Sequence, residues 1–274
     1  MTETSVTIHP SANIDPSAKI HPSAIIGENV SISAGVEIGP WCLIGDDVEI
    51  GEETQVLSHV VIKGPCKIGK ENKIFQFSSV GEECQDKKYA GEPTRLEIGD
   101  RNIIRESCTI HRGTTQDQGL TKIGNDNLLM AYVHVAHDCM VGDHCILANT
   151  TTLAGHVHVA DHVILGGGTM VHQFCQIGAH SMSAGGSIVL RDVPAYVMAS
   201  GQSASAHGLN SEGLKRRGFS SEDILALKRA YKVIFRQGLK LKDALAELEP
   251  VAETVPVVKT FVDSIAQSKR GIIR

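Results

Sequence analysis

Histidines and an aspartate cluster in the middle of this 274-residue chain. His134, His137 and Asp138 occur within one short segment, and further histidines follow at positions 156, 158, 162 and 172. Histidine changes its charge near neutral pH, so it can remove a proton from a hydroxyl group or bind a metal ion. An adjoining aspartate can fix the tautomer of a histidine and stabilise its protonated form. The segment therefore predicts either base catalysis or metal binding.

A six-residue period surrounds these histidines. From residue 123 to residue 189 an aliphatic side chain returns at every sixth position, except at Ser183. The series consists of Ile123, Leu129, Val135, Val141, Leu147, Leu153, Val159, Leu165, Val171, Ile177 and Val189. A small or β-branched residue usually stands two positions earlier, which is the alternation of a short β-strand. This period predicts a parallel β-helix in which three hexads form one coil of 18 residues.

The same period begins near the N-terminus. Every sixth residue from Ile8 to Val80 is Ile or Val. The pattern fails at 81–97, resumes in the same phase at Ile98, and shifts by one position after a second break at 113–122. Both breaks are predicted to be loops that leave the solenoid, and loops on a regular scaffold often carry function.

The C-terminal part of the sequence changes to a helical period. A connection rich in Gly, Ser and Ala is predicted for 191–219. Ser220 or Ser221 can then cap a helix that runs to Gln237, with Asp223 completing a capping box and Gly238 ending the helix. Further amphipathic helices are predicted for 240–249 and 256–268. The expected domains are a β-helix over residues 1–195 and a connection with a helical domain over 196–274.

Charge is distributed unevenly along the chain. Residues 1–210 carry 13 Lys and Arg against 23 Asp and Glu, whereas residues 211–274 carry 13 against 8. The basic end, which includes Lys215, Arg216 and Arg217, predicts an acidic partner protein, and no nucleic-acid partner is expected. No targeting leader and no apolar stretch of membrane-spanning length is found, so a cytoplasmic protein without a membrane span is expected.

Seven cysteines are present without a Cys-x-x-Cys pair. They are Cys42, Cys66, Cys84, Cys108, Cys139, Cys145 and Cys175. Their spacing matches the small inward positions of the hexads. They are therefore predicted to be small buried hydrophobic residues and not disulfides or metal ligands.

Five segments resemble one enzyme family. They are KYAGEPTRLEIGDRNIIRESCTIHRGT from Lys88, GNDNLLMAYVHVAHDC from Gly124, ILANTTTLAGHV from Ile146, HQFCQIGAH from His172 and EGLKRRGF from Glu212. These segments and the hexads cover nearly the whole chain. They resemble the acyl-carrier-protein-dependent UDP-N-acetylglucosamine O-acyltransferases, which begin lipid A synthesis. The chain departs from that family by two extra hexads at the N-terminus.

The resemblance implies a fold and an assembly. The expected fold is an all-β left-handed parallel β-helix with a small C-terminal α-helical domain, although crossover connections are ordinarily right-handed. A homotrimer is expected, with active sites in grooves between neighbouring subunits. The implied reaction moves a (R)-3-hydroxyacyl chain from acyl carrier protein to the 3-hydroxyl of UDP-N-acetylglucosamine, without a cofactor or a metal.

Roles for individual residues also follow from the resemblance. His137 is expected to be the general base and Asp138 its orienting partner. Since one coil has 18 residues, Gly155 is expected about 4.8 Å above His137, with its N–H available to an oxyanion. Substrate-binding roles are implied for Asp86, Lys88, His134, His156, His172, Gln173, Asn210, Glu212, Arg216 and Arg217.

Gly185 is implied to set the acyl-chain length. A glycine has no side chain to close the groove, so a longer 3-hydroxyacyl chain is expected to be preferred over a shorter one. The alternative is that Gly185 only allows a tight corner of the solenoid.

Three other functions remain open from the sequence. One is a zinc enzyme like the trimeric β-helix carbonic anhydrases, which bind zinc with three histidines shared between subunits. The candidate ligands are His134, His137, His156 and His162. Another is a related N-acyltransferase that acts on a later amino sugar, although the repeats begin at once and leave no room for its extra N-terminal domain. The third is a non-catalytic hexapeptide scaffold, which would not require the histidine segment and the first loop together.

Overall fold

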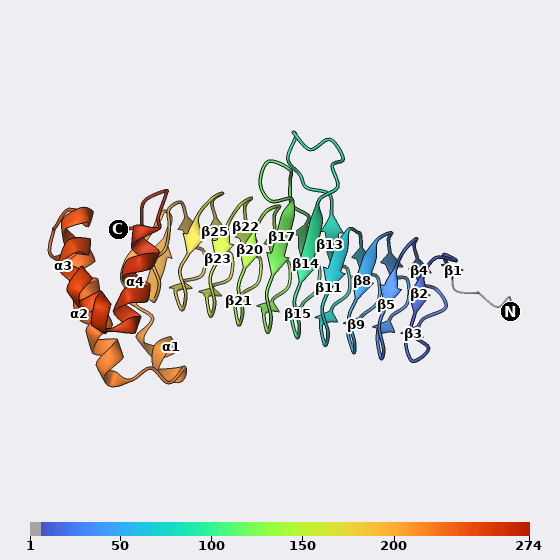
Figure 1. The fold of residues 1–274 in the computed structure, drawn as a ribbon, viewed down its shortest axis with the longest axis horizontal. Coiled ribbons are helices and arrows are strands. Elements are labelled where there is room, and N and C mark those ends of the chain that lie inside the picture. Colours follow the sequence, from blue (N-terminus) through green and yellow to red (C-terminus); the bar gives the residue numbers. More distant parts are fainter. Residues whose placement is uncertain (1–6) are drawn as a thin grey trace.

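Short parallel strands stack into three flat faces in the computed structural model, which describes residues 7–274 (Figure 1). We name these faces sheets A, B and C. Sheet A contains β1 (Thr7–Ile8), β4 (Ile25–Ile26), β7 (Leu43–Ile44), β10 (Val61–Ile62), β13 (Ser79–Glu82), β16 (Thr109–His111), β19 (His134–Val135), β22 (Thr152–Leu153), β25 (Met170–Val171) and β28 (Ile188–Val189).

The chain visits the other two sheets in the same order in each coil. Sheet B contains β2 (Asn13–Ile14), β5 (Ser31–Ile32), β8 (Val48–Ile50), β11 (Cys66–Ile68), β14 (Arg95–Ile98), β17 (Leu120–Ile123), β20 (Met140–Val141), β23 (His158–Val159) and β26 (Gln176–Ile177). Sheet C contains β3 (Lys19–Ile20), β6 (Glu37–Ile38), β9 (Gln55–Val56), β12 (Lys73–Ile74), β15 (Ile103–Ile104), β18 (Leu128–Leu129), β21 (Ile146–Leu147), β24 (Ile164–Leu165), β27 (Met182–Ser183), β29 (Val197–Gly201) and β30 (Ala204–Leu209).

Each two-residue strand turns one side chain outward and the next inward. In β7, Leu43 is half-buried and Ile44 is fully buried. The next coil repeats this register, since Val61 pairs with Leu43 and Ile62 pairs with Ile44. Stacked inward Ile, Leu and Val side chains form one continuous core, as expected for a solenoid. The predicted parallel β-helix is confirmed, and its left-handed winding stays a prediction.

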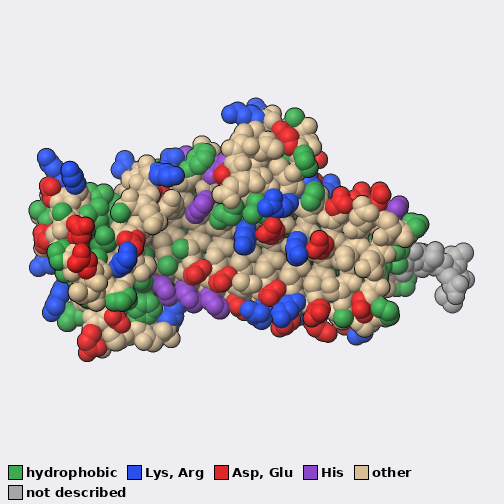
Figure 2. All heavy atoms as spheres, in the orientation of Figure 1, with side chains coloured by type: hydrophobic (Ala, Val, Ile, Leu, Met, Phe, Trp, Pro, Cys, Tyr) green, Lys and Arg blue, Asp and Glu red, His purple; other side chains and the backbone are tan. Residues whose placement is uncertain are grey.

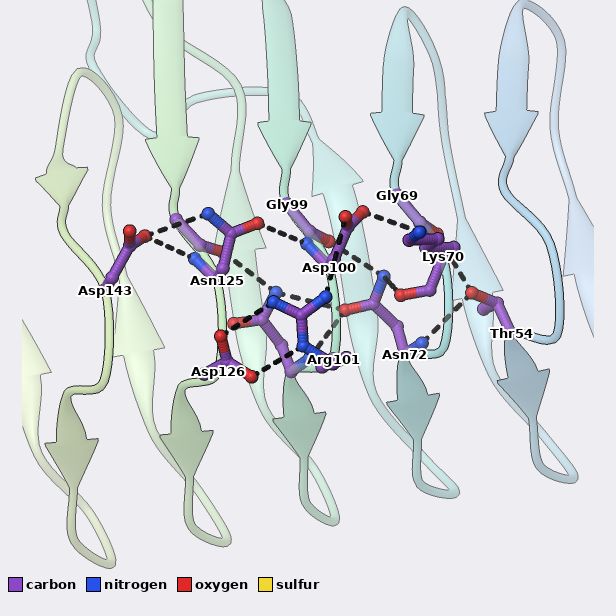
Figure 3. A network of polar contacts seen from close by, with 12 residues as sticks. Thr54, Gly69, Lys70, Asn72, Gly99, Asp100, Arg101, Asn125, Asp126 and Asp143 are labelled. Carbon is purple, nitrogen blue, oxygen red and sulfur yellow. Dashed lines mark hydrogen bonds and ion pairs between the residues drawn. The ribbon is translucent and has the colours of Figure 1, made fainter.

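Three columns of turns join the sheets, and we name them the AB, BC and CA edges after the sheets that they connect. Buried amide side chains stabilise the BC edge. The Asn102 Nδ2–H donates to Asn72 Oδ1 at 3.0 Å, and the Asn127 N–H donates to Asn102 Oδ1 at 3.0 Å. Figure 3 shows this polar edge, including Asp100 and Asn125. At these turns the side-chain amides supply hydrogen bonds to buried groups that lack a partner in a β-sheet.

Two loops leave the solenoid at the AB edge in consecutive coils. The first spans 83–94 between β13 and β14, and the second spans 112–119 between β16 and β17. Both project from the same side of the solenoid (Figure 1). The start of β14 connects them, because the Arg95 N–H donates to Gly119 O at 2.9 Å. The irregular structure therefore lies beside the turn that carries His137 and Asp138.

The predicted irregular connection contains regular structure. Strands β29 and β30 form an antiparallel pair, with β29 added in parallel to β27, and helix α1 (Ser211–Arg216) follows. The sequence Val-Met-Ala-Ser-Gly of β29 is weak in β-propensity. Pairing with β27 decides its structure, since strand preference depends strongly on context.

The helical domain contains α2 (Ser221–Arg236), α3 (Leu241–Thr254) and α4 (Pro256–Ala266). As predicted, Ser220 caps α2, and its Oγ accepts from the Asp223 N–H at 3.0 Å. Helix α3 runs beyond the predicted end at residue 249, because buried Leu248 and Ala252 continue one apolar stripe past Pro250. Among residues 7–274, no helix combines the length and the apolar character needed to cross a membrane.

All seven cysteines are free and buried, as predicted. Burial raises the pKa of the Cys66 thiol to about 12, so this thiol is unreactive at neutral pH. Cys84 lies in the first loop and not in a hexad, which corrects the assignment made from its spacing.

Candidate active site

The AB edge stacks the candidate catalytic residues on successive coils. His137 and Asp138 follow β19, and Gly155 and His156 occupy the same turn after β22. The two turns are in direct contact, because the His156 N–H donates to His137 O at 3.0 Å. Gln173 takes the corresponding place after β25. The predicted column of His137, Gly155 and Gln173 is therefore present.

His137 and Asp138 form a hydrogen-bonded pair. Nδ1 of His137 lies 2.8 Å from Asp138 Oδ2. A carboxylate only accepts, so Nδ1 carries the proton and Nε2 keeps its lone pair. Thr114 of the second loop donates to the same carboxylate from its N–H at 2.8 Å and from its hydroxyl at 2.7 Å. This arrangement is that of a base and its orienting group.

The Asp138 carboxylate carries a negative charge in a buried position. Its side chain is fully buried, whereas 15% of the His137 side chain is exposed. Burial disfavours the charged form, but hydrogen bonds from His137 and Thr114 outweigh burial and lower the pKa of Asp138. A charged carboxylate against the ring stabilises the imidazolium that forms when Nε2 of His137 takes a proton.

Only glycine fits at position 155. A Cβ there would lie 2.6 Å from Cε1 and 2.7 Å from Nε2 of His137. The missing side chain therefore lets the imidazole ring pack against the coil above it. Within residues 7–274 no protein group accepts the Gly155 N–H. This N–H remains available to a ligand near the base.

A second histidine-aspartate pair lies beside the first. Nδ1 of His156 is 2.9 Å from Oδ2 of Asp117, which belongs to the second loop. The His156 ring stacks on Phe174 with centroids 4.4 Å apart and meets the His137 ring edge-on at 5.1 Å. Its Nε2 lies 3.8 Å from Asp138 Oδ2. His156 is therefore held next to the catalytic candidates.

His134 lies on the outer face of sheet A. Its Nδ1 is 2.7 Å from the Thr109 hydroxyl, and its ring meets His111 edge-on at 5.2 Å. Burial lowers the pKa of His134 to about 4, with smaller contributions from His111 and His137. His134 is therefore neutral at pH 7, and it can exchange hydrogen bonds with a substrate without adding positive charge.

Asp86 and Lys88 lie in the first loop. The Lys88 N–H donates to Asp86 Oδ1 at 2.9 Å, and the Lys88 side chain is exposed. Burial raises the pKa of the Cys84 thiol, and the carboxylates of Asp86 and Asp138 raise it further. The first loop also contacts the second loop, because Arg112 Nη2–H donates to the Tyr89 hydroxyl at 3.3 Å. An exposed lysine in this loop can bind a phosphate group.

His172 and Gln173 are exposed at the AB edge, one coil beyond His156. Nδ1 of His172 contacts Gln173 O at 3.1 Å. The hydrogen bonds of the described chain include none from the Gln173 side-chain amide. This amide is therefore available to a substrate that lies along the edge.

Asn210 and Glu212 lie at the BC edge and not near His137. Asn210 is buried, accepts from the Gly213 N–H at 3.2 Å and donates to His180 O at 3.0 Å. It caps helix α1 and ties this helix to the solenoid. Glu212 is exposed and pairs with Lys215 at 2.8 Å.

Arg216 and Arg217 end helix α1 on the same edge. Arg216 is exposed, whereas Arg217 lies by a row of stacked histidines and lowers the pKa of His162 and His180, for which burial is the larger cause. The His162 ring stacks on the His180 ring at 4.6 Å and on the His144 ring at 4.8 Å. Figure 2 shows a row of histidine side chains leading to the helical end. Within one subunit, these candidates therefore lie at a different edge from His137.

Gly185 lies at the CA edge, in the turn between β27 and β28. A Cβ there would meet Gly167 O at 3.3 Å and only one other atom, at 4.0 Å. The neighbouring Gly186 has a positive φ of 70°, and it is this residue that the turn requires to be glycine. Apart from this one close contact, the space around Gly185 is open.

One group of three side chains within the described residues could hold a metal ion. It consists of His137, Asp138 and His156, whose possible ligand atoms lie within 4.8 Å of one another. The other two histidines of the zinc alternative lie elsewhere. His134 contacts Thr109 on sheet A, and His162 stacks in the row on the BC edge. The four-histidine zinc site is therefore not assembled within one subunit.

Thr114 and Asp117 are the site residues that sequence reasoning misses. Both belong to the second loop and hydrogen bond to Asp138 and His156 respectively. The break in the hexad pattern marks the loop as an insertion. It carries no information about where the side chains of the loop point.

Three family models match parts of the chain. Residues 192–273 match the family model described as UDP N-acetylglucosamine O-acyltransferase, domain 2, and residues 120–155 match the bacterial transferase hexapeptide model. Residues 2–90 match the model of the GMPPB C-terminal domain.

Solved structures extend the match to nearly the whole chain. The UDP-N-acetylglucosamine O-acyltransferase of Moraxella catarrhalis is 53% identical, with 97% of this chain and 99% of that chain covered and a TM-score of 0.85. LpxA of Acinetobacter baumannii is 51% identical, with coverage of 97% and 99% and a TM-score of 0.85. The acyltransferase of Francisella novicida is 44% identical, with coverage of 98% and 94% and a TM-score of 0.86. The chain therefore belongs to the UDP-N-acetylglucosamine O-acyltransferase family.

Proposed function

We propose that this protein transfers a (R)-3-hydroxyacyl chain from acyl carrier protein to the 3-hydroxyl of UDP-N-acetylglucosamine, as the first step of lipid A biosynthesis. The observation that carries the proposal is the His137–Asp138 pair at the AB edge of a chain from this acyltransferase family. The relatives of known structure are acyltransferases, which favours this function over the zinc alternative and over a non-catalytic hexapeptide scaffold.

The reaction uses the groups of the AB edge in sequence. Nε2 of His137 removes the proton of the sugar hydroxyl, and the oxygen attacks the thioester carbonyl. The Gly155 N–H hydrogen bonds to the oxyanion of the tetrahedral intermediate. When the intermediate collapses, the carbon-sulfur bond breaks and the His137 imidazolium returns its proton to the thiolate. Asp138 holds the ring and balances its charge throughout these steps.

A homotrimer is supported by the unequal outer faces of the solenoid. Outward residues of sheet B are largely polar, for example Ser31, Glu49, Lys67, Glu97, Lys122 and Gln176. Apolar side chains point outward from sheets A and C and from the CA edge that joins them. They are Ile25, Leu43, Val61, Met170 and Ile188 on sheet A, Ile103, Leu128, Ile146, Ile164 and Met182 on sheet C, and Trp41, Phe77 and Tyr132 at the CA edge. Outward apolar side chains on two adjoining faces are typical of a surface that packs against another subunit.

The position of these faces also bears on the active site. If sheet A of one subunit packs against sheet C of the next, three CA edges meet at the threefold axis. The AB edge of each subunit then lies beside the BC edge of its neighbour. This packing puts Arg216 and Arg217 of a neighbour next to His137, although a single subunit keeps them apart. The acyl chain can lie between sheets A and C, past the outward Met170, toward Gly185.

An acidic carrier protein is supported by the charge of the C-terminal region. Residues 211–274 carry 13 Lys and Arg against 8 Asp and Glu, and Arg216 is exposed. Guanidinium groups also bind phosphates with paired hydrogen bonds, so the same region suits the nucleotide or the phosphopantetheine arm of the carrier.

An acyl-transfer assay tests the proposed function. Purified protein is given UDP-N-acetylglucosamine and a panel of 3-hydroxyacyl carrier proteins, and the acylated sugar nucleotide is measured. His137→Ala is expected to remove nearly all turnover, because His137 combines a fully buried orienting carboxylate, Asp138, with a ring that lies against Gly155. Size-exclusion chromatography with light scattering checks that the variant and the wild type are both trimers. A folded His137→Ala trimer that keeps more than a few per cent of the wild-type rate rules out His137 as the base.

A further inference from the structure

We infer that Asp117 is a positioning residue, which holds the imidazole of His156 in the tautomer whose Nε2 faces a substrate. The inference rests on the proposed acyl transfer, since His156 is one of the substrate-binding candidates of that site. It adds the second loop to the machinery of the site.

The hydrogen bond to Asp117 selects the tautomer. Nδ1 of His156 lies 2.9 Å from Asp117 Oδ2, and a carboxylate offers no proton. The proton of a neutral His156 must therefore be on Nδ1. The partner of one ring nitrogen decides the state of the other, so Nε2 keeps its lone pair.

The lone pair on Nε2 points to the class of group that it binds. Nε2 of His156 lies 3.8 Å from Asp138 Oδ2, too far for a hydrogen bond. Within residues 7–274 no protein donor reaches it. A neutral Nε2 accepts a hydrogen bond, so its ligand is a hydroxyl or an amide N–H of a substrate that lies beside His137.

The other contacts of His156 cannot select this tautomer. Phe174 stacks on the ring with centroids 4.4 Å apart and fixes its plane, but stacking does not distinguish Nδ1 from Nε2. The edge-on contact with His137 sets the ring at 90° to its neighbour without a hydrogen bond between the two rings. Selection of Nδ1 as the protonated nitrogen is therefore left to Asp117.

The Asp117 side chain is not needed to shape its own loop. The backbone turn is closed by the Asp117 N–H to Thr114 O at 3.3 Å and by the Gly119 N–H to Thr114 O at 2.9 Å. The Asp117 side chain remains about one-third exposed, with 34% of its surface accessible. A substitution at Asp117 should therefore change His156 while the loop keeps its conformation.

One loop thereby orients two imidazoles. Thr114 donates twice to Asp138, which holds His137, and Asp117 accepts from His156 directly. Both rings then carry their proton on Nδ1 and keep the lone pair on Nε2. His137 uses its lone pair as a base, and His156 uses the equivalent lone pair to align a substrate.

Ring-nitrogen NMR tests the inference without any substrate. The ¹⁵N signals of Nδ1 and Nε2 distinguish the two tautomers, and comparison with His156→Gln assigns the signals of His156. The neutral ring of His156 in the wild-type protein is expected to be in the Nδ1–H form. Asp117→Ala is expected to move His156 toward the Nε2–H form, whereas Asp117→Asn keeps an acceptor oxygen and restores Nδ1–H. Gln118→Ala, an exposed substitution in the same loop, serves as the matched control.

Kinetics supply the second measurement. Asp117→Ala is expected to lower kcat/KM about 10- to 100-fold, the cost of a misaligned substrate, with Asp117→Asn closer to wild type and Gln118→Ala unchanged. Unaltered His156 signals in Asp117→Ala, or a kcat/KM within about twofold of Gln118→Ala, overturns the inference. Absence of acyl transfer by the wild type overturns the proposed function instead, and the NMR result then stands by itself on the role of Asp117.

Discussion

The imidazole of His137 lies against the bare backbone of Gly155 on the next coil, so closely that a Cβ at Gly155 would come within 2.6 Å of the ring. The contact follows from the stacking of successive AB-edge turns. It places an unpaired N–H and a base side by side, which is the pairing that attack on a thioester requires.

Gly155→Ala is expected to lower kcat/KM by about 100-fold, because the added methyl group displaces the His137 ring by roughly 1 Å. The acyl-transfer assay measures this effect. Gly45→Ala is the matched control, because Gly45 lies at the AB edge of an early coil, after β7, and a Cβ there would come no closer than 3.3 Å to another atom. Equal rates for the two folded variants would show that His137 does not need the space at Gly155.

The stability of the protein is expected to fall as the pH drops from about 6.5 to about 4. Burial is the main reason that the pKa of His180 is about 4 in the folded chain, compared with 6.5 for an ordinary histidine. Between these values the unfolded chain binds more protons than the folded one, so acid favours unfolding. His180→Phe keeps an aromatic ring in the stack and removes this titration.

Thermal unfolding between pH 4 and pH 8 measures the effect. The unfolding midpoint of His180→Phe is expected to depend less on pH than that of the wild type in this window. Above about pH 7 the two midpoints should change with pH to the same degree. Identical pH profiles would show that the His180 pKa is not lowered in the folded protein.

Chelators are expected to leave acyl transfer unchanged. His137, Asp138 and His156 are close enough to hold a metal ion, but Asp138 and Asp117 already accept from the Nδ1–H groups of the two histidines. Activity after dialysis against a chelator, together with elemental analysis, checks this prediction. Stoichiometric zinc that is lost together with activity would instead favour the carbonic-anhydrase type of site.

Arg216→Glu combined with Arg217→Glu is expected to raise KM for the acyl carrier protein and to weaken the dependence of KM on salt. Opposite charges accelerate the encounter of two proteins, and salt screens this attraction. Lys240→Glu combined with Lys242→Glu makes the same change of charge at the exposed start of α3 and controls for net charge. If both double variants behave alike, the two arginines have no specific role in docking.

Gly185→Met is expected to shift selectivity toward shorter 3-hydroxyacyl chains. The positive φ of the turn is at Gly186 and not at Gly185. A Cβ at Gly185 would make one close contact, 3.3 Å to Gly167 O, which a small shift relieves, so the variant should fold. Each methylene excluded from an apolar groove costs about 0.8 kcal/mol of binding. Relative kcat/KM across a series of carrier-bound chains measures the shift. A folded trimer with the wild-type preference would mean that Gly185 does not limit the chain.

Much of the fold is determined by local pattern. A hexad needs one inward aliphatic residue and one small residue, and these two positions specify strands, corners and the 18-residue coil before any long-range contact is known. The stacking of Gly155 on His137 follows from the same arithmetic. The cap of α2 at Ser220 is equally local, because a serine and the residue three positions later decide it.

The tertiary structure decides the positions of residues that lie outside the hexad repeat. Residues in the loops have no assigned phase, so only the folded loop brings Thr114 to Asp138 and Asp117 to His156. The strands β29 and β30 likewise depend on pairing with β27, since their small residues carry little strand preference of their own. A repeat fixes the position of every residue that lies within it, whereas an insertion takes its position from contacts that are distant in sequence.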